Sequence, residues 1–135
     1  MKEEDGKGQV TMLVVDDQEP FREAMRELVA ATAGFELVGE AASGEGAVVA
    51  IGDLSPELVL MDIRMPGIGG IEAARRVTAA RTDVAVILVS VEPLDTLPES
   101  FQGCGAAAFA RKQDLRPHLL CELWAQALMA RALSA

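Results

Sequence analysis

Three short, almost unbroken apolar runs constrain the fold of this chain most strongly. They read VTMLVV at residues 10–15, ELVLM at 57–61 and VAVILV at 84–89. Strands this apolar usually have both faces covered, as in parallel sheets that carry helices on either side. Two weaker candidates are FELVGEA at 35–41 and AAAFA at 106–110. The pattern therefore predicts a sheet of five parallel strands.

Helical patterns separate these runs. Residues 19–32 are the clearest, because Pro20 would stand in the first turn and apolar side chains recur on one face. Weaker patterns cover about 44–52 and 69–80. Alternating strands and helices, with connections long enough for right-handed crossovers, predict an α/β three-layer sandwich.

The last two helices are expected to differ sharply. The prolines and glycines between residues 91 and 105 leave room only for a short, mobile fourth helix that begins near Leu97. The final helix, at 114–133, would be the longest. Asp114 is its expected N-cap, and Pro117 falls in its first turn.

Length and charge narrow the class of protein. A chain of 135 residues fits one domain, which we place at residues 9–135 after a disordered leader at 1–8. A formal net charge of −9 opposes nonspecific attachment to nucleic acid or to an anionic membrane surface. No apolar run reaches the length of a membrane span, and the start is acidic where a secretory signal is basic and then apolar. We expect a cytoplasmic protein.

Polar side chains that can carry chemistry follow the apolar runs. Asp16 and Asp17 follow the first, Asp62 the third, Ser90 the fourth and Lys112 the fifth. The carboxyl ends of parallel strands meet at one edge of a sheet, where such folds bind their ligands. These five side chains should therefore share one pocket.

Three carboxylates in one pocket repel one another, and a hard divalent cation such as Mg²⁺ would relieve that repulsion. A carboxylate beside Mg²⁺ and an ammonium group is suited to attack phosphorus. Charge alone does not decide which acid attacks. Asp62 is favoured because it stands alone before the irregular stretch IRMPGIGG, whereas the adjacent Asp16 and Asp17 are better placed to hold metal.

In this order and spacing, the motifs resemble the receiver domain of two-component response regulators over roughly residues 10–131. They are the acidic pair DD, the stretch MDIRMPGIGG, the serine that ends VILVS and the ending GAAAFARK. The resemblance implies a flavodoxin-like sheet in the order 2-1-3-4-5 with five helices. It also implies that a phosphohistidine on a sensor histidine kinase phosphorylates Asp62.

The resemblance implies roles for the remaining site residues. The Mg²⁺ ligands would be Asp17, Asp62 and the main-chain carbonyl of Arg64, with Asp16 acting partly through water. Ser90 and Phe109 would be the switch residues, Lys112 the invariant cation, and Pro66 and Gly67 the residues that shape the loop. Val91 and Glu92 would lie at the lip of the pocket. We expect an Arg64–Glu92 ion pair there, which with Val91 would slow loss of the phosphoryl group.

The wording DIRMPG and FELVGEAASGEGAV is most similar to NarL/FixJ-type transcription regulators, whose receivers precede a DNA-binding domain. We therefore expect the receiver part of a longer regulator rather than a stand-alone one. Phosphorylation would remodel the face made by the fourth helix, fifth strand and fifth helix, which could also form a homodimer. The domain would bind no nucleic acid by itself, and its only catalysis would be its own phosphorylation and dephosphorylation.

Departures from the family pattern keep other functions open. Val91 stands where a smaller residue is usual, Gly69 replaces a common acid, and the region of the fourth helix is atypical. A receiver-like interaction module that is not phosphorylated is one alternative. An aspartyl-phosphate hydrolase is another, although such enzymes usually carry Asp-x-Asp on the first strand. A nucleotide or flavin carrier is disfavoured, because the acidic DDQEPF would repel phosphate.

Overall fold

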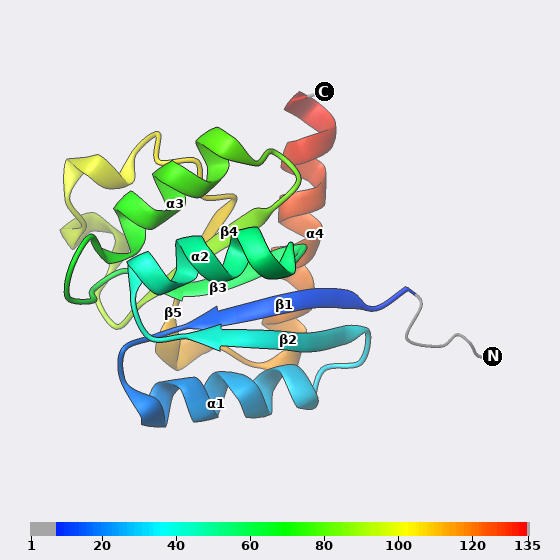
Figure 1. The fold of residues 1–135 in the computed structure, drawn as a ribbon. Helices are drawn as coiled ribbons and strands as arrows, with labels where there is room; N and C mark the ends of the chain where they lie inside the picture. Colours follow the sequence, from blue (N-terminus) through cyan, green and yellow to red (C-terminus); the bar gives the residue numbers. More distant parts are fainter. Residues whose placement is uncertain (1–7, 135) are drawn as a thin grey trace.

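The computed structural model describes residues 8–134, which form one five-stranded parallel sheet with helices on both faces (Figure 1). The strands are β1 (Val10–Val15), β2 (Phe35–Ala41), β3 (Leu58–Asp62), β4 (Ala85–Ser90) and β5 (Ala108–Arg111). The α-helices are α1 (Glu19–Ala30), α2 (Gly44–Leu54), α3 (Gly69–Ala80) and α4 (Pro117–Ser134). Apart from Gly8, the expected disordered leader lies outside the described residues.

The strand order is β2-β1-β3-β4-β5, which confirms the expected topology. All four pairings are parallel. At the carboxyl ends, Val15 pairs with Met61, Asp62 with Val89, and Ser90 with Arg111. The carboxyl ends of these strands, with Asp62 and Ser90, therefore lie at the same edge of the sheet.

Two apolar layers enclose the sheet, because successive side chains of a strand point to opposite faces. Leu13, Val59 and Val86 belong to the layer that includes side chains of α2 and α3. Met12 and Leu60 belong to the layer that includes side chains of α1 and α4. Figure 1 shows α2 and α3 on one face and α1 on the other. The near-absence of polar residues from the central strands follows from this double cover.

The prediction of a short fourth helix in residues 91–105 is wrong. The chain forms two single 3₁₀ turns instead, η1 (Leu94–Thr96) and η2 (Glu99–Phe101). A residue before proline is driven away from the helical region, and Leu97, which precedes Pro98, is extended with ψ 151°. Pro93 and Pro98 themselves stand in extended backbone at the start of each turn. The prolines therefore divide the segment into pieces too short for an α-helix.

The final helix begins at Pro117, so Asp114 is not its N-cap. Asp114 belongs instead to a 3₁₀ turn, η3 (Lys112–Asp114), and Leu115 after it is extended. The first bond of the helix runs from the Leu120 amide to the Arg116 carbonyl at 3.0 Å, which gives Arg116 the capping position. Among the described residues, no helix has the length and apolar character needed to cross a membrane.

Candidate functional site

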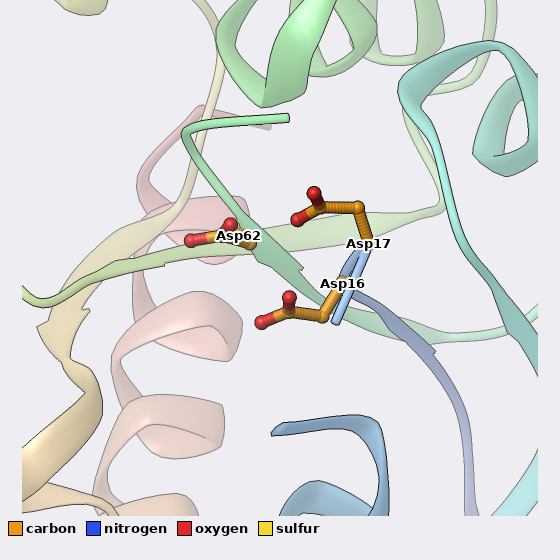
Figure 2. A group of neighbouring side chains, drawn as sticks. All are labelled: Asp16, Asp17 and Asp62. Atoms are coloured by element: carbon orange, nitrogen blue, oxygen red, sulfur yellow. The ribbon is translucent and has the colours of Figure 1, made fainter. Parts of the chain in front are cut away.

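The predicted acids come together at the carboxyl edge of the sheet. Asp16 and Asp17 follow β1 directly, and Asp62 is the last residue of β3. Figure 2 shows their three carboxyl groups turned toward a common space. One oxygen from each lies within 4.8 Å of the other two. The sequence prediction of a shared acidic pocket is therefore met by the geometry.

Burial distinguishes the three acids. Asp16 is fully buried and Asp62 is 6% exposed, whereas Asp17 is exposed. Asp16 Oδ1 accepts a hydrogen bond from the Gln18 amide at 3.0 Å, and its main-chain carbonyl accepts one from Arg22 at 2.7 Å. Asp16 Oδ2 is buried as well and forms an ion pair with the Lys112 ammonium. Three carboxylates that converge on one space are a donor set suited to a hard cation.

Lys112, in η3, supplies the positively charged side chain of the site. Its ammonium lies closer to Asp16 than to Asp62. Its Nζ is 2.6 Å from Asp16 Oδ2 and 3.4 Å from Asp62 Oδ1. Only 9% of its side chain is exposed. The lysine therefore bridges the two buried acids.

Phe21 is a site residue that sequence reasoning missed. Its ring, on α1, lies under the Lys112 ammonium with 3.6 Å between Nζ and the ring centroid. The helical pattern assigns Phe21 only to the apolar face of its helix. Its place four residues after Asp17, in the first turn of the helix that leaves the site, is the signal that could have found it.

The environment of Asp62 makes its charged form costly. Burial is the main cause that raises the pKa of its carboxyl from 3.8 to about 6, and the negative charges of Asp16 and Asp17 add to the rise. Lys112 acts in the opposite direction. A carboxylate whose charge is poorly compensated gains from an added cation or from bonding to phosphorus.

Ser90 is the last residue of β4, and the lip residues Val91 and Glu92 follow it. Ser90 is buried, and its hydroxyl accepts a hydrogen bond from the Glu92 amide at 3.0 Å. Arg64 Nε lies 2.6 Å from Glu92 Oε1, so the expected ion pair forms across the pocket. The Arg64 side chain is 60% exposed and that of Glu92 38%, which limits the contribution of the pair to stability. Val91, which lies between Ser90 and Glu92 in the chain, is 55% exposed.

Phe109 lies farther from the acids than Ser90 in the sheet register. It pairs with Leu88, whereas Ser90 pairs with Arg111 at the end of the strands. Its ring is half-buried and packs edge-on against Phe101 of η2, with 5.7 Å between centroids. The aromatic side chain thus connects β5 to the segment that replaces the fourth helix.

The loop after Asp62 is held by close backbone approaches. Gly67 adopts φ +85°, which favours glycine, and a Cβ there would lie 2.5 Å from the Glu45 carboxylate. That carboxylate accepts a hydrogen bond from the Ile68 amide at 3.3 Å, a contact the sequence did not predict. A Cβ on Gly70 would lie 2.1 Å from the Asp62 carbonyl oxygen. The glycines therefore let α2 and α3 pack directly on the loop that carries Arg64 and Pro66.

Comparison with known proteins agrees with this geometry. Residues 12–122 match the model of the response regulator receiver domain. The chain therefore belongs to the response regulator receiver domain family.

The relatives lie among regulators of the expected kind. The response regulator GacA of Pseudomonas aeruginosa is 37% identical over 103 residues, which are 76% of this chain and 48% of that protein. The response regulator UvrY of Escherichia coli K12 is 38% identical over 103 residues, with 76% and 47% covered. The chain thus spans about half the length of the curated relatives it matches.

Solved structures lead to the same class. The signal receiver domain of the putative response regulator NarL from Mycobacterium tuberculosis superimposes with a TM-score of 0.80 at 28% identity. That match covers 88% of this chain and 96% of the other. A LuxR-family two-component response regulator from Aurantimonas sp. gives 0.75 at 26% identity, with 84% and 81% covered. The expected likeness to NarL/FixJ-type regulators is confirmed.

Proposed function

We propose that this receiver accepts a phosphoryl group on Asp62 from the phosphohistidine of a sensor histidine kinase. The observation that carries the proposal is a buried carboxylate with a buried ammonium 3.4 Å away and two further acids beside it, at the carboxyl edge of a parallel sheet. Family membership supports the same reading.

The chemistry needs only one bond to form and one to break. A carboxylate oxygen of Asp62 attacks phosphorus, the bond from phosphorus to the histidine nitrogen breaks, and the electron pair stays on the imidazole. The Lys112 ammonium lies where it can neutralise charge on the transferring group. Later attack by water returns the carboxylate and inorganic phosphate. The protein would thus catalyse only its own phosphorylation and dephosphorylation.

The acidic pocket suits Mg²⁺. Asp17, Asp62 and the main-chain carbonyl of Arg64 would hold the ion, with Asp16 contributing partly through water; once bound, the ion supplies positive charge that stabilises phosphoryl transfer. The three converging carboxylates support this assignment. Pro66 and Gly67 shape the loop that presents the carbonyl.

Phosphorylation would act on output through Ser90 and Phe109. The buried Ser90 hydroxyl would turn toward the phosphoryl group, and Phe109 would reorient behind it, remodelling the face made by η1, η2, β5 and α4. This shift between two states would regulate transcription through a DNA-binding domain in a longer regulator, and the same face could form a homodimer. The acidic receiver would take no direct part in nucleic-acid binding and would work in the cytoplasm.

Intact mass measures the proposed reaction directly. After incubation with Mg²⁺ and phosphoramidate, the protein should gain one phosphoryl group, while Asp62→Asn and a metal-free sample should gain none. Asp53→Asn changes an exposed acid of α2 and serves as the matched control. An unmodified wild-type protein would favour an interaction module that works without phosphorylation. Repeated turnover of small phosphoesters would instead favour a hydrolase.

A further inference from the structure

The Lys112 ammonium touches three groups, and only two of them are acids. Asp16 Oδ2 lies at 2.6 Å and Asp62 Oδ1 at 3.4 Å. The third is the face of the Phe21 ring, 3.6 Å away at its centroid. A cation this close to an aromatic face is attracted by the negative charge of the ring's π-system, and more strongly where water is excluded.

Phe21 is fixed relative to the site by its own helix. The next residue, Arg22, donates a hydrogen bond to the Asp16 carbonyl at 2.7 Å, and the Arg22 amide bonds to the Gln18 carbonyl at 3.1 Å. The first turn of α1 is therefore attached to the same acid that holds the ammonium. The ring also packs against the apolar layer that α1 and α4 share.

An apolar pocket lies behind this contact. It has a volume of about 370 Å³, and Phe21, Met25, Leu28, Val91 and Lys112 are among its lining residues. Most of the lining is apolar, and Gln113 is its other polar side chain. The face of the Phe21 ring attracts a cation, so it compensates the ammonium where this mostly apolar lining meets it.

We propose that Phe21 is a positioning residue for phosphoryl transfer, whose ring face holds the Lys112 ammonium against the buried acids. This inference rests on the proposed function, because it concerns the cation that would stabilise the transferring phosphoryl group. Without the ring, water would solvate the ammonium from the pocket side and the lysine would lose its fixed direction. The contact should therefore affect the rate of transfer at saturating donor more than the binding of the donor.

Substitutions at position 21 separate an aromatic effect from a packing effect. Phosphorylation rates are measured by intact mass over a range of phosphoramidate concentrations at saturating Mg²⁺. Phe21→Leu keeps an apolar side chain, and we expect its saturating rate to fall by about 3-fold to 10-fold with little change in half-saturation. Phe21→Tyr keeps the ring face and should retain the wild-type rate. Leu28→Val removes volume from the same pocket farther along α1 and should also retain it.

Fluorinated phenylalanines at position 21 give a second readout that packing does not imitate. Each added fluorine withdraws charge from the ring face while nearly preserving its shape, so the logarithm of the saturating rate should fall stepwise with fluorine number. Equal rates across this series, or a Phe21→Leu rate equal to that of Phe21→Tyr, would overturn the proposal. A wild-type protein that gains no phosphoryl group would overturn the proposed function itself, and this inference with it.

Discussion

Gly70, at the start of α3, packs against the main chain of Asp62 so closely that a Cβ would lie 2.1 Å from the Asp62 carbonyl oxygen. The neighbour is backbone, which cannot rotate away as the end of a side chain can. Helix α3 therefore rests directly on the strand end that carries the proposed phosphoacceptor. The absence of one methyl group sets the distance between them.

Gly70→Ala should destabilise the fold by about 2–4 kcal/mol, because the clash outweighs the better helix propensity of alanine. Gly52→Ala on α2 is the matched control, since nothing lies within 4 Å of a Cβ there. It should stabilise the fold by about 0.5–1 kcal/mol. Urea unfolding monitored by circular dichroism measures both changes. Equal effects of the two substitutions would show that α3 can shift away from Asp62 at little cost.

The raised pKa of Asp62 predicts a stability that depends on pH. Its folded pKa of about 6 exceeds the ordinary 3.8, so between these values the folded state binds more protons than the unfolded state. The free energy of unfolding therefore falls as the pH rises toward 6. Above pH 6 the full cost of holding the buried carboxylate in its charged form is present. At neutral pH, the free energy of unfolding of Asp62→Asn should exceed that of wild type by about 1–3 kcal/mol, so the variant is the more stable protein.

The Asp62→Asn advantage should shrink as the pH is lowered toward 3.8, where the wild-type carboxyl is neutral in the folded state. Denaturant titrations across this range in metal-free buffer follow the difference. Asp53→Asn, at an exposed acid, should show no such trend. A pH-independent difference for Asp62→Asn would contradict the assignment of the cost to this carboxyl.

Mg²⁺ should raise the Tm of the wild-type protein, since binding to the folded state alone stabilises it by about 2.7 kcal/mol at a hundredfold excess over Kd. Asp17→Asn should remove most of this increase, because its exposed carboxylate completes the acidic cluster. Asp53→Asn should leave it intact. Differential scanning calorimetry with and without Mg²⁺ provides the measurement, and an unchanged increase in Asp17→Asn would argue against the proposed ligand set.

Val91 and the Arg64–Glu92 pair predict different effects on the lifetime of the phosphoryl group. Val91 follows the buried Ser90 and lines the pocket that Lys112 also lines, so Val91→Ala should admit water and speed hydrolysis by about 3-fold. Arg64→Gln should change the rate less, because its ion pair with Glu92 is largely exposed. Decay of the phosphorylated mass after donor removal distinguishes them. A larger effect of Arg64→Gln would reverse this ranking.

Sequence reasoning predicted the sheet and the acidic pocket because both follow from local rules. Apolar runs covered on two faces identified the central strands, and the shared edge of parallel strands placed Asp16, Asp17 and Asp62 together. The missing fourth helix also has a local cause, since Leu97 precedes Pro98 and cannot easily be helical. That restriction outweighed the single helical turn the pattern allowed.

The contacts of Lys112, Phe21 and Glu45 depend on side-chain directions, which the spacing of residues in the sequence does not encode. Lys112 lies nearer to Asp16 than to Asp62 because of the path of η3 after β5. Phe21 reaches the ammonium from the first turn of α1, far from Lys112 in sequence. Glu45 contacts the loop only because Gly67 has no side chain. Each contact joins elements distant in sequence.

The two 3₁₀ turns between β4 and β5 would rearrange differently from a single α-helix in that position. An α-helix responds as one rigid body, because many internal hydrogen bonds move together. Here the Arg75 side chain of α3 donates a hydrogen bond to the Ser100 carbonyl of η2 at 2.9 Å. Phe101 packs edge-on against Phe109. This surface can therefore rearrange only if these individual contacts break. The response of this surface to the proposed phosphorylation should therefore change when one arginine or one aromatic ring is exchanged.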